Sequence, residues 1–192
     1  MTTLHIAQVN IARMRAALED PVMREFVARL DEINTVADGS PGFVWRLQTE
    51  AGNATYLRPY GDDRILFNLS VWETVEDLKD YVYGSAHKEV LRLRHDWFEK
   101  LETPSMALWW VPAGHLPSVD EAKKRLGHLQ ENGPSAFAFT FRVLFPPDPQ
   151  FVASIDWSSF EPCPAASLRK GRRSGLEIEA RRDPHEAVMK SR

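Results

Sequence analysis

Cysteine is almost absent from this sequence, and the long apolar runs of membrane proteins are missing altogether. The single Cys163 has no partner for an internal disulfide and excludes a cysteine-rich metal site. A membrane-spanning helix needs roughly 20 apolar residues, and no stretch of the chain provides them. The N-terminus also lacks the cationic and apolar regions of a signal peptide. We therefore expect a cytoplasmic protein that does not contact a membrane.

A strong charge of either sign is missing as well. The formal net charge is -3 and the pI is about 6.1, so no basic field favours nucleic acid as a partner. The sequence contains no P-loop, no dinucleotide fingerprint and no nucleophile elbow, so nothing in it supports nucleotide use or covalent catalysis. With 192 residues, 43% of them hydrophobic, the chain can build one substantial core.

Prolines mark the predicted end of the folded part. Pro146 and Pro147 follow an apolar run, and the chain beyond them is densely charged and poor in apolar residues. Such a composition buries too little apolar surface to offset the loss of chain entropy. We predict one domain over residues 1–147 and an irregular or disordered tail over residues 148–192. The tail also carries aromatic residues that would suit docking onto the body or a partner, namely Phe151, Trp157 and Phe160.

The spacing of apolar residues predicts strands and helices in the order β-α-β-β-α-β, followed by an added helix and strand. Alternating patterns predict strands over residues 4–11, 43–49, 64–72, 105–111 and 136–145. Helical spacing begins after the capping residues Asp20, Thr74, Ser85 and Ser118. The first six elements correspond to a ferredoxin-like α+β unit, in which helices cover one face of an antiparallel sheet.

The other face of the predicted sheet also needs a cover. Trp109 and Trp110 are neighbours on one strand, so their side chains point to opposite faces and cannot both lie under the helices. Packing of two sheets against each other in a homodimer is the most economical solution.

The strand over residues 64–72 has one purely apolar face and one mixed face. The mixed face carries Asn68, Ser70 and Trp72, which place an aromatic ring beside two small hydrogen-bonding groups. A wall of this kind is typical of a site for a small organic molecule, although it does not identify the molecule. We predict these three residues as substrate-binding residues.

Four long motifs in order resemble a family of uncharacterised bacterial proteins, the domain of unknown function 3291. They are Phe67-Asn-Leu-Ser-Val-Trp-Glu-Thr-Val-Glu-Asp-Leu78, Tyr81-Val-Tyr-Gly-Ser-Ala-His87, Trp97-Phe98 and Leu108-Trp-Trp-Val-Pro-Ala-Gly-His115. The resemblance covers about residues 4–147 and implies the dimeric α/β-barrel class. That class includes cofactor-free antibiotic-biosynthesis monooxygenases and haem-using dismutases and dehydratases. The resemblance supplies no established catalytic residues.

Two histidines are the candidate catalytic residues. His87 follows the capping Ser85 at a helix N-terminus, where the positive potential favours a neutral imidazole that can accept a proton. His115 follows a strand end and Gly114, where a loop can expose it. Each histidine has a structural alternative, as a hydrogen-bonding residue between elements or in a turn.

The remaining candidates are aromatic and cationic. Trp97 and Trp109 are predicted to line the same pocket as the mixed strand face, although ordinary core and dimer packing is the favoured explanation for each of them taken alone. Arg46 on the second strand is predicted to neutralise an acidic ligand or to pair with a carboxylate across the dimer.

No set of His, Asp and Glu residues has metal-ligand spacing, so we expect no bound metal and no cofactor. Haem would need an axial ligand such as His87 or His115, and neither has a diagnostic neighbour. We expect a homodimer that binds a small, largely apolar or aromatic organic molecule. If it is an enzyme, the class indicates a cofactor-independent monooxygenase or an isomerase. The alternatives are a non-catalytic dimer and a haem-dependent enzyme.

Overall fold

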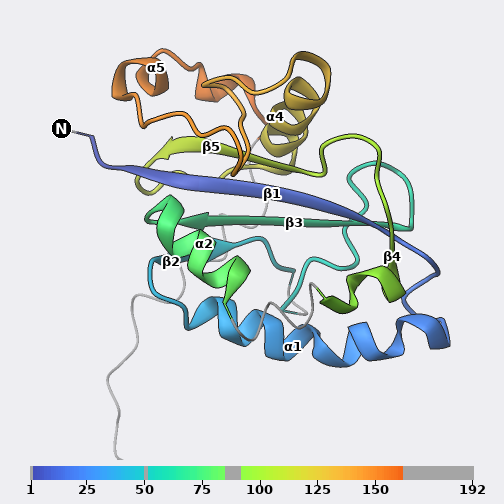
Figure 1. Cartoon of the computed structure of the whole chain (residues 1–192). Helices are drawn as coiled ribbons and strands as arrows, with labels where there is room; N and C mark the ends of the chain where they lie inside the picture. The colour runs from blue at the N-terminus through green and yellow to red at the C-terminus, as the bar shows by residue number, and fades with distance from the viewer. Residues whose placement is uncertain (1, 50–51, 85–91, 162–192) are drawn as a thin grey trace, which may run out of the picture.

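A computed structural model describes residues 2–49, 52–84 and 92–161 of the chain (Figure 1). The strands are β1 (Leu4–Met14), β2 (Phe43–Arg46), β3 (Ile65–Trp72), β4 (Phe98–Glu99) and β5 (Met106–Pro112). The helices are α1 (Arg24–Asp38), α2 (Val75–Tyr83), α4 (Val119–Asn132) and α5 (Pro149–Ala153), with single 3-10 turns at Pro21–Met23 and Trp157–Ser159.

The strands form one antiparallel sheet with the ferredoxin-like order. β3 lies between β2 and β1, and β5 pairs with the other edge of β1 along most of its length. The far end of β1 pairs with the short β4 instead. The predicted α+β, ferredoxin-like architecture is therefore confirmed.

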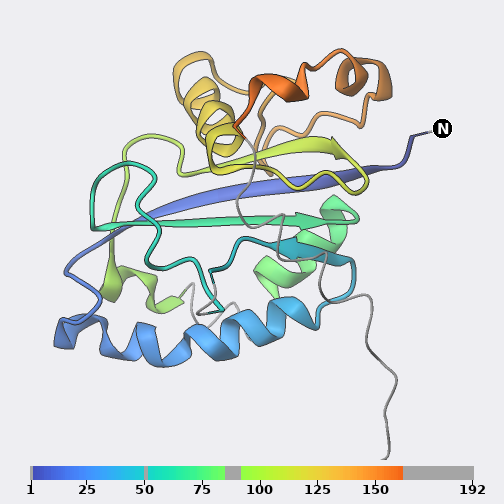
Figure 2. The same ribbon diagram turned by 180° about the vertical axis from the view of Figure 1, so that it is seen from behind.

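Helices cover both faces of this sheet, which gives the molecule three layers (Figures 1 and 2). On one side lie α1 and α2, and on the other side lie α4 and α5. The names "α1–α2 side" and "α4 side" are used below for these two faces. Along β3, Leu66 and Trp72 pack on the α1–α2 side, whereas Phe67, Leu69 and Val71 pack on the α4 side.

The premise of the sheet-to-sheet dimer is wrong for this chain. The face that needed a cover contains Val9, Leu69 and Trp109, and these side chains are at most 2% exposed within the single chain. Ala122, Leu126 and Leu129 of α4 pack against them in the same core cluster. The homodimer stays a prediction, without the support of an uncovered apolar face.

The prediction of a last strand over residues 136–145 is also wrong. Residues 136–145 make one isolated bridge to the sheet, in which Phe139 and Leu108 exchange two backbone hydrogen bonds of 2.9 and 2.8 Å. On either side the hydroxyls of Ser135 and Thr140 accept backbone N–H groups and close turns. These local hydrogen bonds compete with a strand ladder. Phe137 consequently packs against the α4 cluster, away from Phe139.

The packed part of the chain extends beyond Pro147, where the sequence placed its end. Asp148 caps α5 by accepting backbone N–H groups, and Val152 of α5 is 2% exposed. Trp157 packs against the core cluster on the α4 side. Residues 162–192 lie outside the described part of the chain.

Candidate functional site

The central strands carry a set of hydrogen-bonding side chains on the α1–α2 side. The register of β1 and β3 places Gln8 directly opposite Ser70, and Asn10 directly opposite Asn68. Residues opposite each other in an antiparallel pair share one face, so the four side chains form a contiguous polar patch. The term "polar patch" is used below for Gln8, Asn10, Asn68 and Ser70.

The polar patch is open to its surroundings. Asn68 is exposed, because the pairing of β3 with β2 ends at Ser70 and only β1 pairs with β3 at this position. The other three residues are half-buried. Within the described part of the chain, the amide groups of Asn10 and Asn68 have no hydrogen-bond partner. Two neutral amides therefore remain available to a ligand as donors and acceptors.

A chain of hydrogen bonds joins the polar patch to a buried aromatic wall. The indole Nε1 of Trp72 donates to Ser70 Oγ at 3.0 Å, and that hydroxyl donates to Gln8 Oε1 at 3.0 Å. Trp72 is fully buried, with Tyr81 of α2 stacked on it at a ring distance of 4.9 Å and Phe43 edge-on at 5.3 Å. The predicted combination of an aromatic ring with small polar groups is present on this face.

Tyr81 contributes a hydroxyl that stays protonated over a wide pH range. Burial raises its pKa to about 12, the cation of Arg46 opposes this shift, and the carboxylate of Asp38 adds to it. A neutral phenol donates a hydrogen bond but does not act as a base near neutral pH.

Arg46 already has a carboxylate partner in its own chain, so its predicted role as a free acid-binding cation is corrected. Its Nε and Nη2 lie 2.8 and 3.1 Å from the two carboxylate oxygens of Asp38, at the end of α1. Its Nη1 donates to the carbonyl of Gly52 at 2.8 Å. The guanidinium thereby ties β2 to α1, and the polar patch beside it carries no uncompensated charge.

Trp97 does not join this site. It is 2% exposed and packs with Met14, Phe26 and Leu66 at the other end of the same face. Leu66 and Trp72 are six positions apart on β3, which corresponds to roughly 20 Å at the rise of a strand. Trp97 is therefore a core residue between the sheet and α1.

Trp109 and His115 lie on the α4 side, away from the polar patch. The register pairs Trp109 with Ala7, which also pairs with Val71, so Trp109 shares a face with Val71 and not with Trp72. Its Nε1 donates to Glu121 Oε1 at 2.7 Å, and His115 Nε2 lies 2.7 Å from Glu121 Oε2. The prediction that Trp109 lines the same pocket as the mixed strand face is wrong, since the sheet separates them, and His115 lies with Trp109. His87 lies outside the described residues.

Glu121 and Arg125 form the polar centre of the α4 side. Both side chains are fully buried on α4, and Arg125 Nη2 lies 3.7 Å from Glu121 Oε1. Desolvation lowers the pKa of Arg125 to about 10, opposed by the negative charge of Glu121, so the guanidinium remains cationic near neutral pH. The turn that brings His115 back to this centre contains Gly114, whose φ of 90° favours glycine.

The sequence analysis missed Gln8, Asn10, Glu121 and Arg125. Gln8 and Asn10 alternate with the apolar Ala7, Val9 and Ile11, so period-two alternation was a usable signal for the first two. Glu121 stands where a capping box places a surface carboxylate. Ser118 Oγ does accept the Glu121 backbone N–H at 3.1 Å, but the Glu121 side chain turns inward to Trp109. Nothing in the local sequence signals that orientation.

A metal or haem site requires ligand side chains that converge on one point. The described ranges contain no group of three or more His, Cys, Asp or Glu side chains arranged to hold a metal ion. His115 does not fit an axial haem ligand, because its Nε2 is engaged with Glu121 and its ring lies 4.4 Å from that of Trp157. No helix among the described residues is both long and apolar enough to span a bilayer.

Comparison with protein families assigns the chain. Residues 5–153 match the model of the family described as domain of unknown function (DUF3291), and the chain belongs to this family. The match covers the sheet, both helical layers and α5. No curated protein sequence matches the chain.

Solved structures with some likeness to the chain are distant. SnoaB, a cofactor-independent oxygenase from Streptomyces nogalater, is 14% identical with a TM-score of 0.40, covering 58% of this chain and 95% of its own. A putative antibiotic biosynthesis monooxygenase from Chloroflexus aurantiacus is 10% identical with a TM-score of 0.38, covering 60% and 98%. A protein of unknown function from Nitrosomonas europaea is 9% identical with a TM-score of 0.39, covering 62% and 99%.

Proposed function

We propose that this member of the family binds a small, uncharged aromatic molecule with hydroxyl or carbonyl groups at the polar patch. The observation that carries the proposal is the pair of amides without partners among the described residues, the exposed Asn68 and the half-buried Asn10 opposite it, on a face that helices otherwise cover. A half-buried amide without a partner is costly, and a ligand oxygen that reaches Asn10 past the open Asn68 satisfies it.

The chemistry of the surroundings supports an uncharged and aromatic ligand. The side chains of the polar patch are amides and a hydroxyl, and the nearest guanidinium, Arg46, is neutralised by Asp38. The half-buried ring of Tyr81, stacked on the fully buried Trp72, supplies the aromatic surface at one end of the patch. Flat apolar walls with a few hydrogen-bonding groups are typical of sites for small organic molecules.

We further propose that the bound molecule is oxidised by dioxygen without a bound cofactor. The support is the resemblance of the motifs to the class that contains cofactor-free monooxygenases. In such a reaction the deprotonated substrate gives its own electrons to dioxygen. Asn68 is positioned to donate a hydrogen bond to the substrate oxyanion, and such donors stabilise developing charge. The proton acceptor is assigned to His87, which stays a prediction.

Native mass spectrometry of protein purified from its own host tests the binding proposal. We expect a bound small molecule on the unmodified chain and loss of that mass in Asn68→Leu, because the substitution removes the open amide. Gln150→Leu, which replaces an exposed amide on α5 at the other side of the sheet, is the matched control and retains the mass. A bound mass that survives Asn68→Leu contradicts the proposed location.

The oxidation proposal has a separate test. Oxygen consumption measured with the identified ligand is expected to depend on His87, so His87→Gln abolishes turnover while binding persists. Binding without any oxygen consumption by the unmodified protein contradicts the enzymatic proposal and leaves a non-catalytic binding protein.

A further inference from the structure

Arg125 is buried without enough hydrogen-bond acceptors. Its side chain is 0% exposed, and its Nη1 donates to the carbonyl of Phe137 at 2.7 Å. The Nε and Nη2 groups are buried and have no hydrogen-bond partner among the described residues. Leaving charged donors unpaired in the interior is expensive, so the site is incomplete as it stands.

The unpaired edge of Arg125 is the edge that binds carboxylates. A guanidinium presents Nε and one terminal nitrogen as a flat fork that matches two coplanar oxygens. Arg46 provides the example within this chain, since its Nε and Nη2 hold both oxygens of Asp38. The same two nitrogens of Arg125 have no such pair of hydrogen-bond acceptors, since the Glu121 carboxylate reaches only Nη2 and only at 3.7 Å.

Aromatic rings surround the Arg125 guanidinium. Its central carbon lies 3.9 Å from the ring centroid of Phe137, 5.7 Å from those of Trp157 and Phe160, and 5.8 Å from that of Trp109. These rings lend a flat ligand apolar surfaces against which to stack. We propose that Arg125 anchors a second ligand site, on the α4 side of the sheet, which takes a small aromatic carboxylate.

The carboxylate beside Arg125, that of Glu121, is already engaged elsewhere. Its Oε1 accepts from Trp109 Nε1 at 2.7 Å, its Oε2 lies 2.7 Å from His115 Nε2, and its ion pair with Arg125 Nη2 is long, at 3.7 Å. At the surface of the same helix, Lys124 and Asp120 pair with each other at 2.9 Å. Arg125 therefore keeps donors for a second carboxylate.

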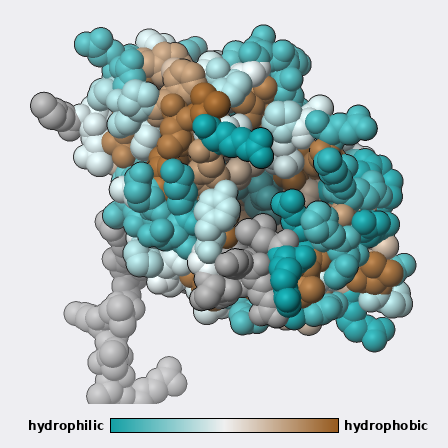
Figure 3. Space-filling view, in the orientation of Figure 1, coloured by the Kyte–Doolittle hydropathy of each residue, from teal (hydrophilic) through white to brown (hydrophobic). Residues whose placement is uncertain are grey.

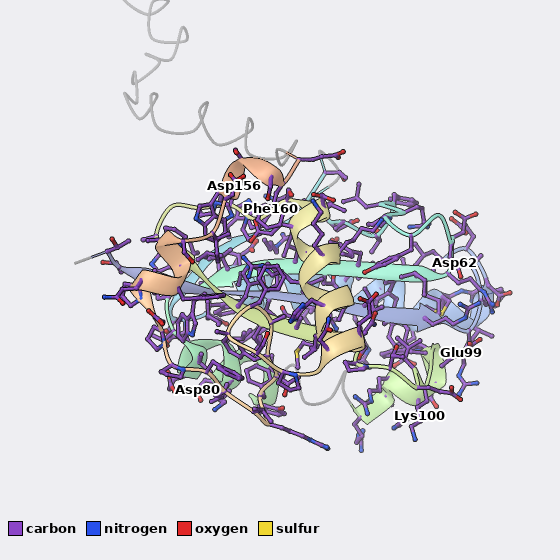
Figure 4. The ribbon with its side chains drawn as sticks, turned by 90° about the horizontal axis from the view of Figure 1, so that it is seen from above. Asp62, Asp80, Glu99, Lys100, Asp156 and Phe160 are labelled. Atoms are coloured by element: carbon purple, nitrogen blue, oxygen red, sulfur yellow. The ribbon has the colours of Figure 1, made fainter. Side chains whose placement is uncertain are left out.

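Residues 156–161 form the cover of this site. Figure 4 shows Asp156 and Phe160 beside one end of α4, where the cover lies on the outside of the molecule. Its polar attachments to α4 are long: Lys124 Nζ donates to the Ser159 carbonyl at 3.2 Å, and the Glu161 backbone N–H donates to Asp120 Oδ2 at 3.3 Å. Ligand entry requires these two contacts and the packing of Trp157 to open.

Titration of the full-length protein at pH 6 with 2-naphthoate and with 2-naphthamide, followed by calorimetry, tests the proposal. The amide has the same shape but presents a donor where the acid presents its second acceptor. We expect the carboxylate to bind at least about tenfold more tightly, since charged hydrogen bonds are the strong ones. Arg125→Lys keeps the charge but loses the fork, so the preference falls to less than about threefold. Arg29→Lys on α1, a half-buried arginine paired with Glu25 far from this site, is the matched control and keeps the preference.

A second variant leaves Arg125 in place in case Arg125→Lys does not fold. Lys124→Gln removes the attachment of the cover at the Ser159 carbonyl, so 2-naphthoate is expected to associate at least about fivefold faster in stopped-flow fluorescence, with the preference over the amide retained. Asn68→Leu has no effect on either ligand, which separates this site from the polar patch. Equal affinity for acid and amide, no saturable binding at millimolar concentration, or a soaked crystal that shows only water at Nε and Nη2 overturns the proposal.

Discussion

At the scale of single residues, the buried indoles Trp72 and Trp109 have their N–H groups satisfied by side chains from other positions in the chain. Trp72 reaches Ser70 and through it Gln8, while Trp109 reaches Glu121. The sequence predicts the grouping of Trp72 with Ser70, because both lie on one strand with a period of two. It does not predict the partner Gln8, since the register between two strands is a property of the folded sheet.

Ser70→Ala is expected to lower the free energy of unfolding by about 1–3 kcal/mol. The substitution leaves the buried Trp72 Nε1 without its acceptor and Gln8 without its donor. Urea unfolding measures the change. Ser40→Ala, which removes an exposed hydroxyl that donates to the Val36 carbonyl, is the control and changes the value by less than about 0.5 kcal/mol.

Tyr81 makes stability depend on pH in the alkaline range. Its pKa of about 12 in the folded protein lies above the ordinary value of 10.0. The unfolded chain therefore loses the Tyr81 proton at lower pH than the folded protein does. The free energy of unfolding therefore keeps this contribution below pH 10 and loses about 2 kcal/mol between pH 10 and 12. Denaturant titrations at several pH values are expected to show a shallower fall for Tyr81→Phe. The same fall in both proteins contradicts the assignment.

At the scale of elements, the first six follow their local sequence patterns closely. Asp20, Thr74 and Ser118 each cap the helical turn that begins after them, as predicted. The strand predicted over residues 136–145 does not form, and this has a physical cause. Alternating aromatic residues favour a strand whether or not the edge of the sheet beside them can pair with it over a long stretch. Local turns at Ser135 and Thr140 decide the outcome there.

The capping of α4 has a measurable contribution. Ser118 is 5% exposed, and its hydroxyl accepts the N–H of Glu121, a residue whose side chain holds Trp109 and faces His115. Ser118→Ala is expected to lower the free energy of unfolding by about 1–2 kcal/mol. Ser118→Asp, which retains an acceptor, is expected to recover most of the loss in the same denaturation assay. No recovery in Ser118→Asp contradicts a capping role.

At the scale of the whole molecule, one chain covers both faces of its sheet. In Figure 3 the largest hydrophobic area lies in the upper part of the view, where Figure 1 shows α4 and α5, and smaller areas lie toward the right. Val143 and Leu144 are among the exposed large hydrophobic residues. Opposite ends of the sheet are held differently. At one end, Arg13 pairs with Asp62 and Glu99, both labelled at that end in Figure 4, and at the other end the Trp72 cluster packs.

The sequence predicts the layer of α1 and α2 but not the position of α4, because an added helix can cover its own sheet or the sheet of another copy.

Removing part of the α4 cover tests whether it acts within one chain. Leu126 is fully buried against the sheet, and Leu126→Ala is expected to lower the free energy of unfolding by about 2–4 kcal/mol. Because the contact lies within one chain, the difference between the unfolding midpoints of Leu126→Ala and the unmodified protein is expected to be the same at every protein concentration. A loss of stability that vanishes at high concentration would indicate that a second copy supplies the cover.

The central claim is that the polar patch, on the α1–α2 side, is where this protein meets an uncharged aromatic ligand. Nuclear magnetic resonance of the side-chain amides during titration with 1-naphthol tests it most directly. The account predicts shifts of the Asn68 and Asn10 amide signals and of the Trp72 indole signal, while the indole of Trp109 on the α4 side stays unchanged. Shifts confined to Trp109, or none at saturating probe, would contradict it.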